Sequence, residues 1–300
     1  MASFSLKVTR LALHATEKVS PRLAGRLAFE LFSLTPARQP KGDRARRVFQ
    51  AGEALFSAAE RISFTTGQDR VAGYRFGARN QTAPTVVVVH GWGSRAEYMA
   101  PLSAAIAKLG FEVIVIDFPG HGRSSGNRFN MLKAVQAIAA AADLYGPFDS
   151  AVGHSFGGAA LMVAAGGIIP SIPPVMPGKI VTIASPSEMA GVFRRFAGMA
   201  GLSRKGLGHM MERVRHVAGV GIEAFDIAAG MDRLSIPVLT VHAEDDKEVA
   251  ASHALRYANS GGDVRLYWAN GLGHRRIISD AAVIAEVTAF LRQVEGSAVA

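Results

Sequence analysis

Uninterrupted runs of apolar residues recur along the chain and predict buried strands. The runs cover residues 85–89, 113–116, 180–183 and 238–241, and β-branched residues dominate them. Apolar runs without alternation are typical of parallel strands that are buried on both faces of a sheet. Residues 61–66 and 71–76 alternate more between apolar and polar, and a Gly-Gln-Asp turn lies between them. They predict an antiparallel hairpin at the edge of the sheet.

Apolar residues recur at helical spacing between the predicted strands. The helices that this spacing predicts cover residues 96–109, 131–144, 155–165, 249–258 and 280–294. Strands and helices that alternate at this rhythm favour an α/β fold with a doubly wound, mostly parallel sheet.

The same pattern divides the chain into three zones. Residues 61–186 and 235–300 carry the alternation of an α/β core. Residues 1–60 are helical and basic in character, which predicts a helical N-terminal extension. Residues 187–234 are helical and rich in Met, Gly and Arg, and we expect a cap or lid there. A chain of 300 residues fits one such domain with an insertion better than two independent domains.

Composition and charge narrow the class of protein. Hydrophobic residues make up 49% of the chain, which is enough to bury a large sheet. The absence of cysteine excludes disulfides, cysteine nucleophiles and thiolate metal sites, and it suits a cytoplasmic location. The net charge is +9, but no dense basic run with interleaved aromatic residues occurs, so we expect no nucleic-acid partner.

The N-terminal residues bear on membrane contact. Lys7, Arg10 and Glu17 interrupt the apolar residues too often for a secretory signal, and no stretch reaches the roughly 20 apolar residues of a membrane span. Residues 21–35 mix leucine and phenylalanine with arginine, so they could lie on an anionic membrane surface, pack against the core or mediate dimerisation. We favour packing within the chain and keep peripheral membrane contact as an alternative.

A candidate nucleophile lies in residues 153–157, which read Gly-His-Ser-Phe-Gly and match the pattern G-x-S-x-G. A short apolar lead precedes the motif and an alanine-rich stretch follows it, which predicts a strand, a sharp turn and a helix. Such a turn strains the backbone and exposes the Ser155 hydroxyl, while Gly153 and Gly157 remove side chains that would collide. The helix N-terminus beneath the serine favours negative charge there.

Several segments together resemble the α/β-hydrolase family, and the resemblance covers about residues 62–295. They are His-Gly-Trp-Gly-Ser at 90–94, Asp-Phe-Pro-Gly-His-Gly-Arg-Ser at 117–124, the serine motif, residues 238–249, and Gly-Leu-Gly-His at 271–274. Their order and spacing match those of the family. The resemblance does not define the first 60 residues or the 187–234 segment.

The resemblance implies a catalytic triad in the chain order serine, acid, histidine. His274 then acts as the base that takes the proton of Ser155. The family usually shows Gly-x-x-Asp-x-x-Val at the acid; Ala243 replaces the glycine here, while Asp246 and Val249 keep the spacing. We therefore choose Asp246 as the acid. Asp245 is the next alternative and Glu188 a remote one.

The resemblance also points to the backbone amides of Trp92 and Phe156 as an oxyanion hole. His90, Asp117 and His121 are interpreted as structural residues that shape the adjoining turns.

The insertion holds five of the ten methionines of the chain, at positions 189, 199, 210, 211 and 231. Methionine adapts to varied apolar shapes, so Met199, Met210 and Phe196 are candidate contacts for an apolar acyl group. An equally good interpretation is that these residues simply pack the cap onto the body.

The expected function is that of a serine hydrolase, which cleaves a carboxylic ester or thioester of a small molecule through an acyl-enzyme. The alternatives are hydrolysis of an amide, peptide or carbon–carbon bond by the same triad, or a non-catalytic ligand-binding member of the fold. No cofactor is needed for this reaction. His209 and His216 lack a carboxylate at suitable spacing, so no metal site is expected.

Overall fold

An eight-stranded sheet forms the centre of the molecule in the computed structural model, which describes residues 4–78 and 82–293. The strand order is β1-β2-β4-β3-β5-β6-β7-β8, with β1 and β2 antiparallel and the strands from β4 to β8 parallel. This arrangement confirms the predicted α/β fold and its edge hairpin. The strands are β1 (Glu60–Thr66), β2 (Asp69–Gly77), β3 (Thr85–Val89), β4 (Glu112–Asp117), β5 (Ser150–His154), β6 (Lys179–Ile183), β7 (Val238–His242) and β8 (Val264–Trp268).

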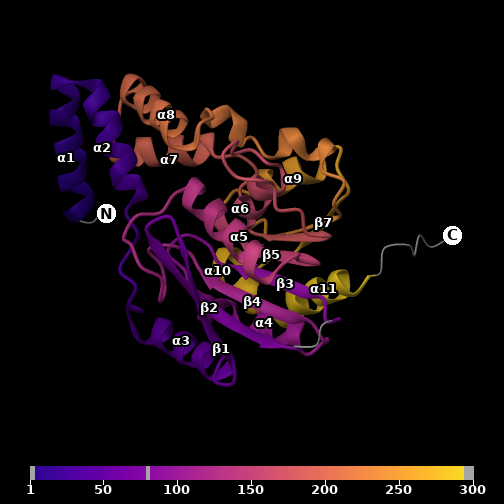
Figure 1. The fold of residues 1–300 in the computed structure, drawn as a ribbon. Coiled ribbons are helices and arrows are strands. Elements are labelled where there is room, and N and C mark those ends of the chain that lie inside the picture. The colour runs from indigo at the N-terminus through magenta and orange to yellow at the C-terminus, as the bar shows by residue number, and fades with distance from the viewer. Residues whose placement is uncertain (1–3, 79–81, 294–300) are drawn as a thin grey trace.

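Helices cover both faces of the sheet (Figure 1). Val87 and Val89 belong to the core on one face, and Val86 and Val88 to the core on the other. The consecutive valines of β3 therefore pack into the cores on both faces of the sheet, as the apolar pattern predicted. One face carries α5 (Met131–Tyr145), α6 (Phe156–Ala165) and α9 (Ser252–Ala258), and the other carries α3 (Asp43–Leu55), α4 (Ala100–Ala107) and α11 (Ala281–Arg292).

Two details differ from the predicted elements. The helix expected over 96–109 begins as a 3₁₀ turn at Ala96–Met99 and continues as α4, because Pro101 has no backbone N–H and fits only the first turn of an α-helix. Strand β8 was not anticipated, since it is short and half-exposed and carries Arg265 among its apolar residues. The predicted end of the last helix at Val294 lies outside the described residues.

The N-terminal helices and the insertion form one layer above the α5–α6 face (Figure 1). This layer consists of α1 (Phe4–Val19), α2 (Pro21–Ser33), α7 (Ala190–Ala200) and α8 (Arg204–Ala218). Gly25 lets α2 and α8 meet closely, because a Cβ atom there would lie 2.6 Å from the carbonyl oxygen of Gly206. Intramolecular packing of residues 21–35 is thus confirmed for one face of α2.

The chain then crosses to the opposite face of the sheet, where α3 packs beside α4. No described helix is both long enough and apolar enough to cross a bilayer.

Candidate active site

Ser155 lies at a sharp turn between β5 and α6. Its φ of 53° and ψ of −122° are strained for a residue with a side chain, and its amide donates to the carbonyl oxygen of Ile183 at 2.7 Å. The two flanking glycines are needed: a Cβ on Gly153 would lie 2.5 Å from the amide of Gly158, and one on Gly157 would lie 2.5 Å from the carbonyl oxygen of His90. The turn holds the serine hydroxyl above the carboxyl ends of the strands.

His274 and Asp246 complete a chain of hydrogen bonds to this serine. His274 Nε2 lies 3.0 Å from Ser155 Oγ, and His274 Nδ1 lies 2.7 Å from Asp246 Oδ2. Because a carboxylate can only accept, the proton of a neutral imidazole is placed on Nδ1. Nε2 is then left as the acceptor for the Ser155 hydroxyl, which is the arrangement that proton removal from the serine requires.

Asp246 is held in its charged form. Burial acts to raise the pKa of this carboxyl, but hydrogen bonds from His274 and from the amides of Val249 and Glu248 prevail and bring the pKa below its usual value. The two alternative acids lie elsewhere. Asp245 accepts from the amide of Gly271, and Glu188 accepts from the amide of Gly191 at the start of α7.

The loop that follows β3 lies directly beside Ser155. A Cβ on Gly91 would be 2.8 Å from Ser155 Cβ, so only glycine permits this approach. The ring of Trp92 packs against that of Phe156 at 5.6 Å between centroids, which ties the loop to the first residue of α6. In the described part of the chain no hydrogen-bond acceptor is recorded for the amides of Trp92 and Phe156, so both are available to a ligand.

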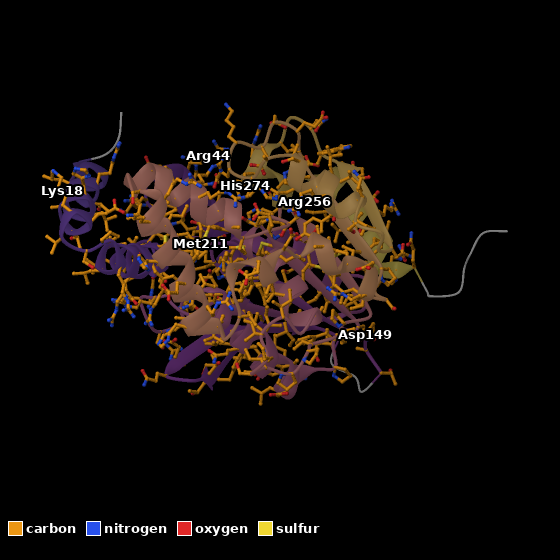
Figure 2. The ribbon with its side chains drawn as sticks, turned by 90° about the horizontal axis from the view of Figure 1, so that it is seen from above. Lys18, Arg44, Asp149, Met211, Arg256 and His274 are labelled. Carbon is orange, nitrogen blue, oxygen red and sulfur yellow. The ribbon has the colours of Figure 1, made fainter. Side chains whose placement is uncertain are left out.

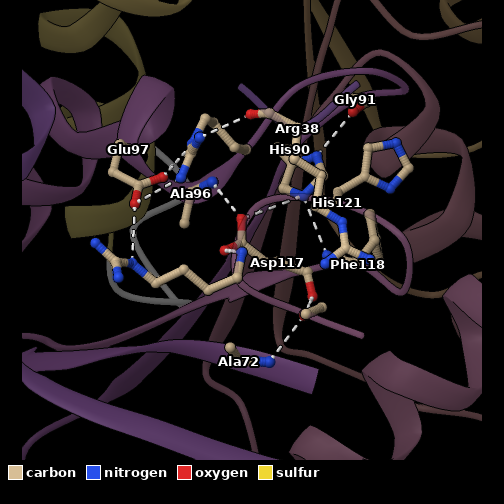
Figure 3. Close-up of polar contacts among 12 residues, drawn as sticks. Arg38, Ala72, His90, Gly91, Ala96, Glu97, Asp117, Phe118 and His121 are labelled. Carbon is tan, nitrogen blue, oxygen red and sulfur yellow. Dashed lines mark hydrogen bonds and ion pairs between the residues drawn. The ribbon is translucent and has the colours of Figure 1, made fainter. Parts of the chain in front are cut away.

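A buried polar network fixes the shape of this loop (Figure 3). Asp117 accepts from the amides of Ala96 and Arg123, each at 2.8 Å. The Nε2 atoms of His90 and His121 accept from the amides of Phe118 and Gly93.

The protonation of these groups is set by burial. It raises the pKa of Asp117 to about 6, with the Glu97 charge adding to the effect, and it lowers the pKa of His121 to about 4. An imidazole Nε2 can accept a hydrogen bond only when the ring is neutral, so the lowered pKa agrees with these contacts. These contacts agree with the structural role that we expected for Asp117, His121 and His90.

His154, the residue before Ser155, makes a contact at the site that sequence reasoning missed. Its Nε2 donates to the backbone carbonyl oxygen of His274 at 2.9 Å. Burial and the neighbouring His274 lower the pKa of His154 to about 3, so the ring stays neutral. It positions the segment that carries His274. The only signal in the sequence was its place inside the serine motif.

An apolar pocket of about 30 Å³ lies under the helical layer and reaches Phe156, the neighbour of Ser155. Residues from α2, α5, α7, α8 and the 3₁₀ turn at Ile222–Phe225 contribute to its wall. The lining residues are Phe29, Phe32, Asn130, Met131, Leu132, Phe156, Met189, Phe193, Val214, Val217, Ala218, Ile222 and Phe225. Sequence reasoning missed the contribution of α2, because it looked for the acyl site in the insertion alone.

The three expected acyl contacts are not brought together at this pocket. Met199 is half-exposed, Met210 is fully buried where α2 crosses α8, and Phe196 packs edge-on against the ring of Phe32. None of the three lines the pocket. Met210 and Phe196 pack within the helical layer, as in the alternative interpretation, whereas Met199 does not.

The described residues contain no group of three or more His, Cys, Asp or Glu side chains that could hold a metal ion.

A sequence profile of the alpha/beta hydrolase family matches residues 86–287, about two thirds of the chain. The protein therefore belongs to the alpha/beta hydrolase family. The matched stretch contains Ser155, Asp246, His274 and the loop at Trp92. No curated protein matches the chain by sequence.

Solved structures of similar fold include several hydrolases. Est1E from Butyrivibrio proteoclasticus, with ferulic acid bound, is 19% identical and has a TM-score of 0.59, over 77% of this chain and 96% of that one. An esterase from Pyrococcus furiosus is 17% identical with a TM-score of 0.59, over 86% and 97%. Mouse alpha/beta hydrolase domain-containing protein 10 is 18% identical with a TM-score of 0.56, over 78% and 97%. At these identities the likeness establishes the fold alone.

Proposed function

We propose that the protein is a serine hydrolase that cleaves a carboxylic ester or thioester through an acyl-enzyme. The observation that carries the proposal is the hydrogen-bonded chain from Ser155 Oγ through His274 to Asp246, at 3.0 Å and 2.7 Å. A strained serine at a helix N-terminus, an accepting imidazole and a buried carboxylate are the groups that acyl transfer to a hydroxyl requires.

The geometry suggests the order of events. His274 Nε2 takes the proton as Ser155 Oγ attacks the carbonyl carbon. The developing oxyanion accepts hydrogen bonds from the amides of Trp92 and Phe156, and the N-terminus of α6 stabilises its charge. The imidazolium, stabilised by Asp246, then returns the proton to the leaving alcohol or thiol. A water molecule, activated by the same imidazole, releases the acid and restores Ser155.

The lining of the pocket favours an apolar acyl group, since nearly every residue in its wall is apolar. Its volume of about 30 Å³ is far below the roughly 150 Å³ of a cavity that binds benzene, so it is too small for an acyl chain. A substrate must therefore displace part of the wall. We infer that the wall moves at α2 and α8, because neither helix carries a residue of the triad or a strand of the sheet.

Covalent labelling tests the proposed nucleophile. A fluorophosphonate probe is expected to label the wild-type protein once per chain at Ser155, because among residues 4–78 and 82–293 only this hydroxyl has an accepting imidazole with a carboxylate behind it. Mass spectrometry of the intact protein and of its peptides measures the adduct. Ser155→Ala should remain unlabelled, and Ser279→Ala, which changes an exposed serine, should label normally. Folded wild-type protein that stays unlabelled would contradict the proposal.

Narrowing of the pocket is expected to change the preference for acyl chain length. Val217→Phe places a ring in the wall contributed by α8 and should lower kcat/KM for a p-nitrophenyl octanoate by about tenfold relative to the acetate. Val192→Phe is the matched control, because Val192 is also partly buried in the helical layer but does not line the pocket. Equal losses on both esters in the Val217 variant would place the acyl chain elsewhere.

A further inference from the structure

The positive charge of the protein is concentrated in the helical layer. Helices α1, α2, α7 and α8 carry eleven lysine and arginine residues against three glutamates, so they hold +8 of the formal +9 of the chain. The remaining residues, including the whole sheet, are nearly neutral in sum. The electrostatic potential of the molecule is therefore asymmetric, and it is most positive around the helical layer above the active site.

The acidic residues of α1 and α2 face the body of the protein. Glu17 accepts from the amide and hydroxyl of Ser203 at the start of α8. Glu30 pairs with Arg128 and lies 3.8 Å from Arg213. Lys18 and Arg26 are exposed and make no ion pair with a described residue. Lys18 and Arg26 thus face solvent, while Glu17 and Glu30 form contacts within the fold.

Exposed leucines lie on the outer side of the same helix pair. Leu23, Leu27 and Leu31 follow one another at four-residue intervals on α2 and are 47%, 40% and 37% exposed. Leu11 and Val19 on α1 are 73% and 84% exposed. The opposite face of α2, with Ala24, Gly25, Ala28 and Phe29, is buried. Helix α2 therefore has two apolar faces, and only one of them is covered within this chain.

We propose that the α1–α2 helix pair docks on the surface of an anionic lipid bilayer, with the leucine face of α2 inserted among the lipids. Apolar side chains flanked by unpaired cations are the combination that binds a helix in the plane of a charged membrane. A second copy of the chain is a poorer occupant, because two layers of +8 would repel each other. Lys18 lies at the outer edge of the molecule, well apart from His274 in the view from above (Figure 2), so docking there leaves the triad uncovered.

Vesicle binding by the full chain tests this proposal, and it is independent of turnover and of the proposed hydrolase activity. The wild-type protein is expected to co-sediment with vesicles of phosphatidylcholine containing about one third phosphatidylglycerol. Binding to vesicles of pure phosphatidylcholine should be at least about tenfold weaker, because several cations lose their attraction to anionic headgroups. Sodium chloride at about 0.5 M should weaken the binding to anionic vesicles.

Variants separate the leucine face from the rest of the surface. Leu23→Gln, Leu27→Gln and Leu31→Gln combined should lower partitioning by about tenfold or more, since three apolar anchors are lost. Lys18→Gln with Arg26→Gln should weaken binding to anionic vesicles only. Leu255→Gln is the matched control, because Leu255 on α9 is also 47% exposed but lies outside the helical layer. Unchanged circular dichroism and melting temperature show that each variant is folded.

Three results would overturn the proposal. The first is wild-type protein that does not bind anionic vesicles. The second is a folded variant with all three leucines replaced by glutamine that binds as well as wild type. The third is a stable dimer in light scattering that the leucine substitutions dissociate, without any vesicle binding, which would assign the leucine face to a second copy.

Discussion

Replacing His274 with alanine is expected to lower kcat for ester hydrolysis by about a million-fold, as the loss of a triad base does in serine proteases. Among the described residues, the imidazole is the only group within 3.0 Å of Ser155 Oγ that is placed to take its proton. The carboxylate of Glu248 is 3.9 Å from His274 Nε2 but is paired with Arg275, so it is no substitute base. Steady-state rates on a p-nitrophenyl ester measure the loss.

The control for this variant is His216→Ala, which removes an exposed histidine at the end of α8. Its kcat should stay within about twofold of wild type, because surface substitutions away from the site have small effects. A folded His274→Ala protein that keeps more than about one hundredth of wild-type kcat would contradict the assignment of the base.

Asp246→Asn is expected to lower kcat by about ten-thousand-fold. An amide in place of the carboxylate can donate to His274 Nδ1, which favours the tautomer with its proton on Nε2. That tautomer cannot accept the proton of Ser155. The pKa of Asp246 is lowered by its hydrogen bonds, so in the wild-type protein this carboxyl is charged at neutral pH.

Asp245→Asn provides the matched control, since its carboxylate is exposed and accepts from the amide of Gly271. It should keep kcat within a few-fold of wild type at neutral pH. Equal losses in the two variants would contradict the choice of Asp246 as the acid.

The core could be predicted from local patterns, and the grouping of Ser155, Asp246 and His274 from the resemblance to a known family. Valine runs define strands that are buried on both faces, and a glycine-flanked serine after such a run predicts the turn at Ser155. Asp246 could be chosen over Asp245 from its spacing to Val249. The structure gives that spacing a physical meaning, because the amide of Val249 donates to Asp246 Oδ1 at 2.9 Å.

The pocket could not be predicted, because its wall joins segments that lie almost two hundred residues apart. Phe29 and Phe32 on α2 meet Val214 and Val217 on α8. The pattern of α2 places apolar residues on two faces, and nothing local decides which face turns inward. The close crossing at Gly25 decides it, because a side chain at this position would collide with the backbone of α8.

The share of the pocket that α2 contributes has a consequence for how proteins of this family diversify. Ser155, Asp246 and His274, the proposed nucleophile, acid and base, all lie within the stretch that matches the family. Phe29 and Phe32 lie ahead of it. If the pocket receives the acyl group as proposed, substitutions at Phe29 and Phe32 would alter which molecules are accepted while Ser155, Asp246 and His274 keep their places. Part of the selectivity can thus change through residues outside the stretch that carries the chemistry.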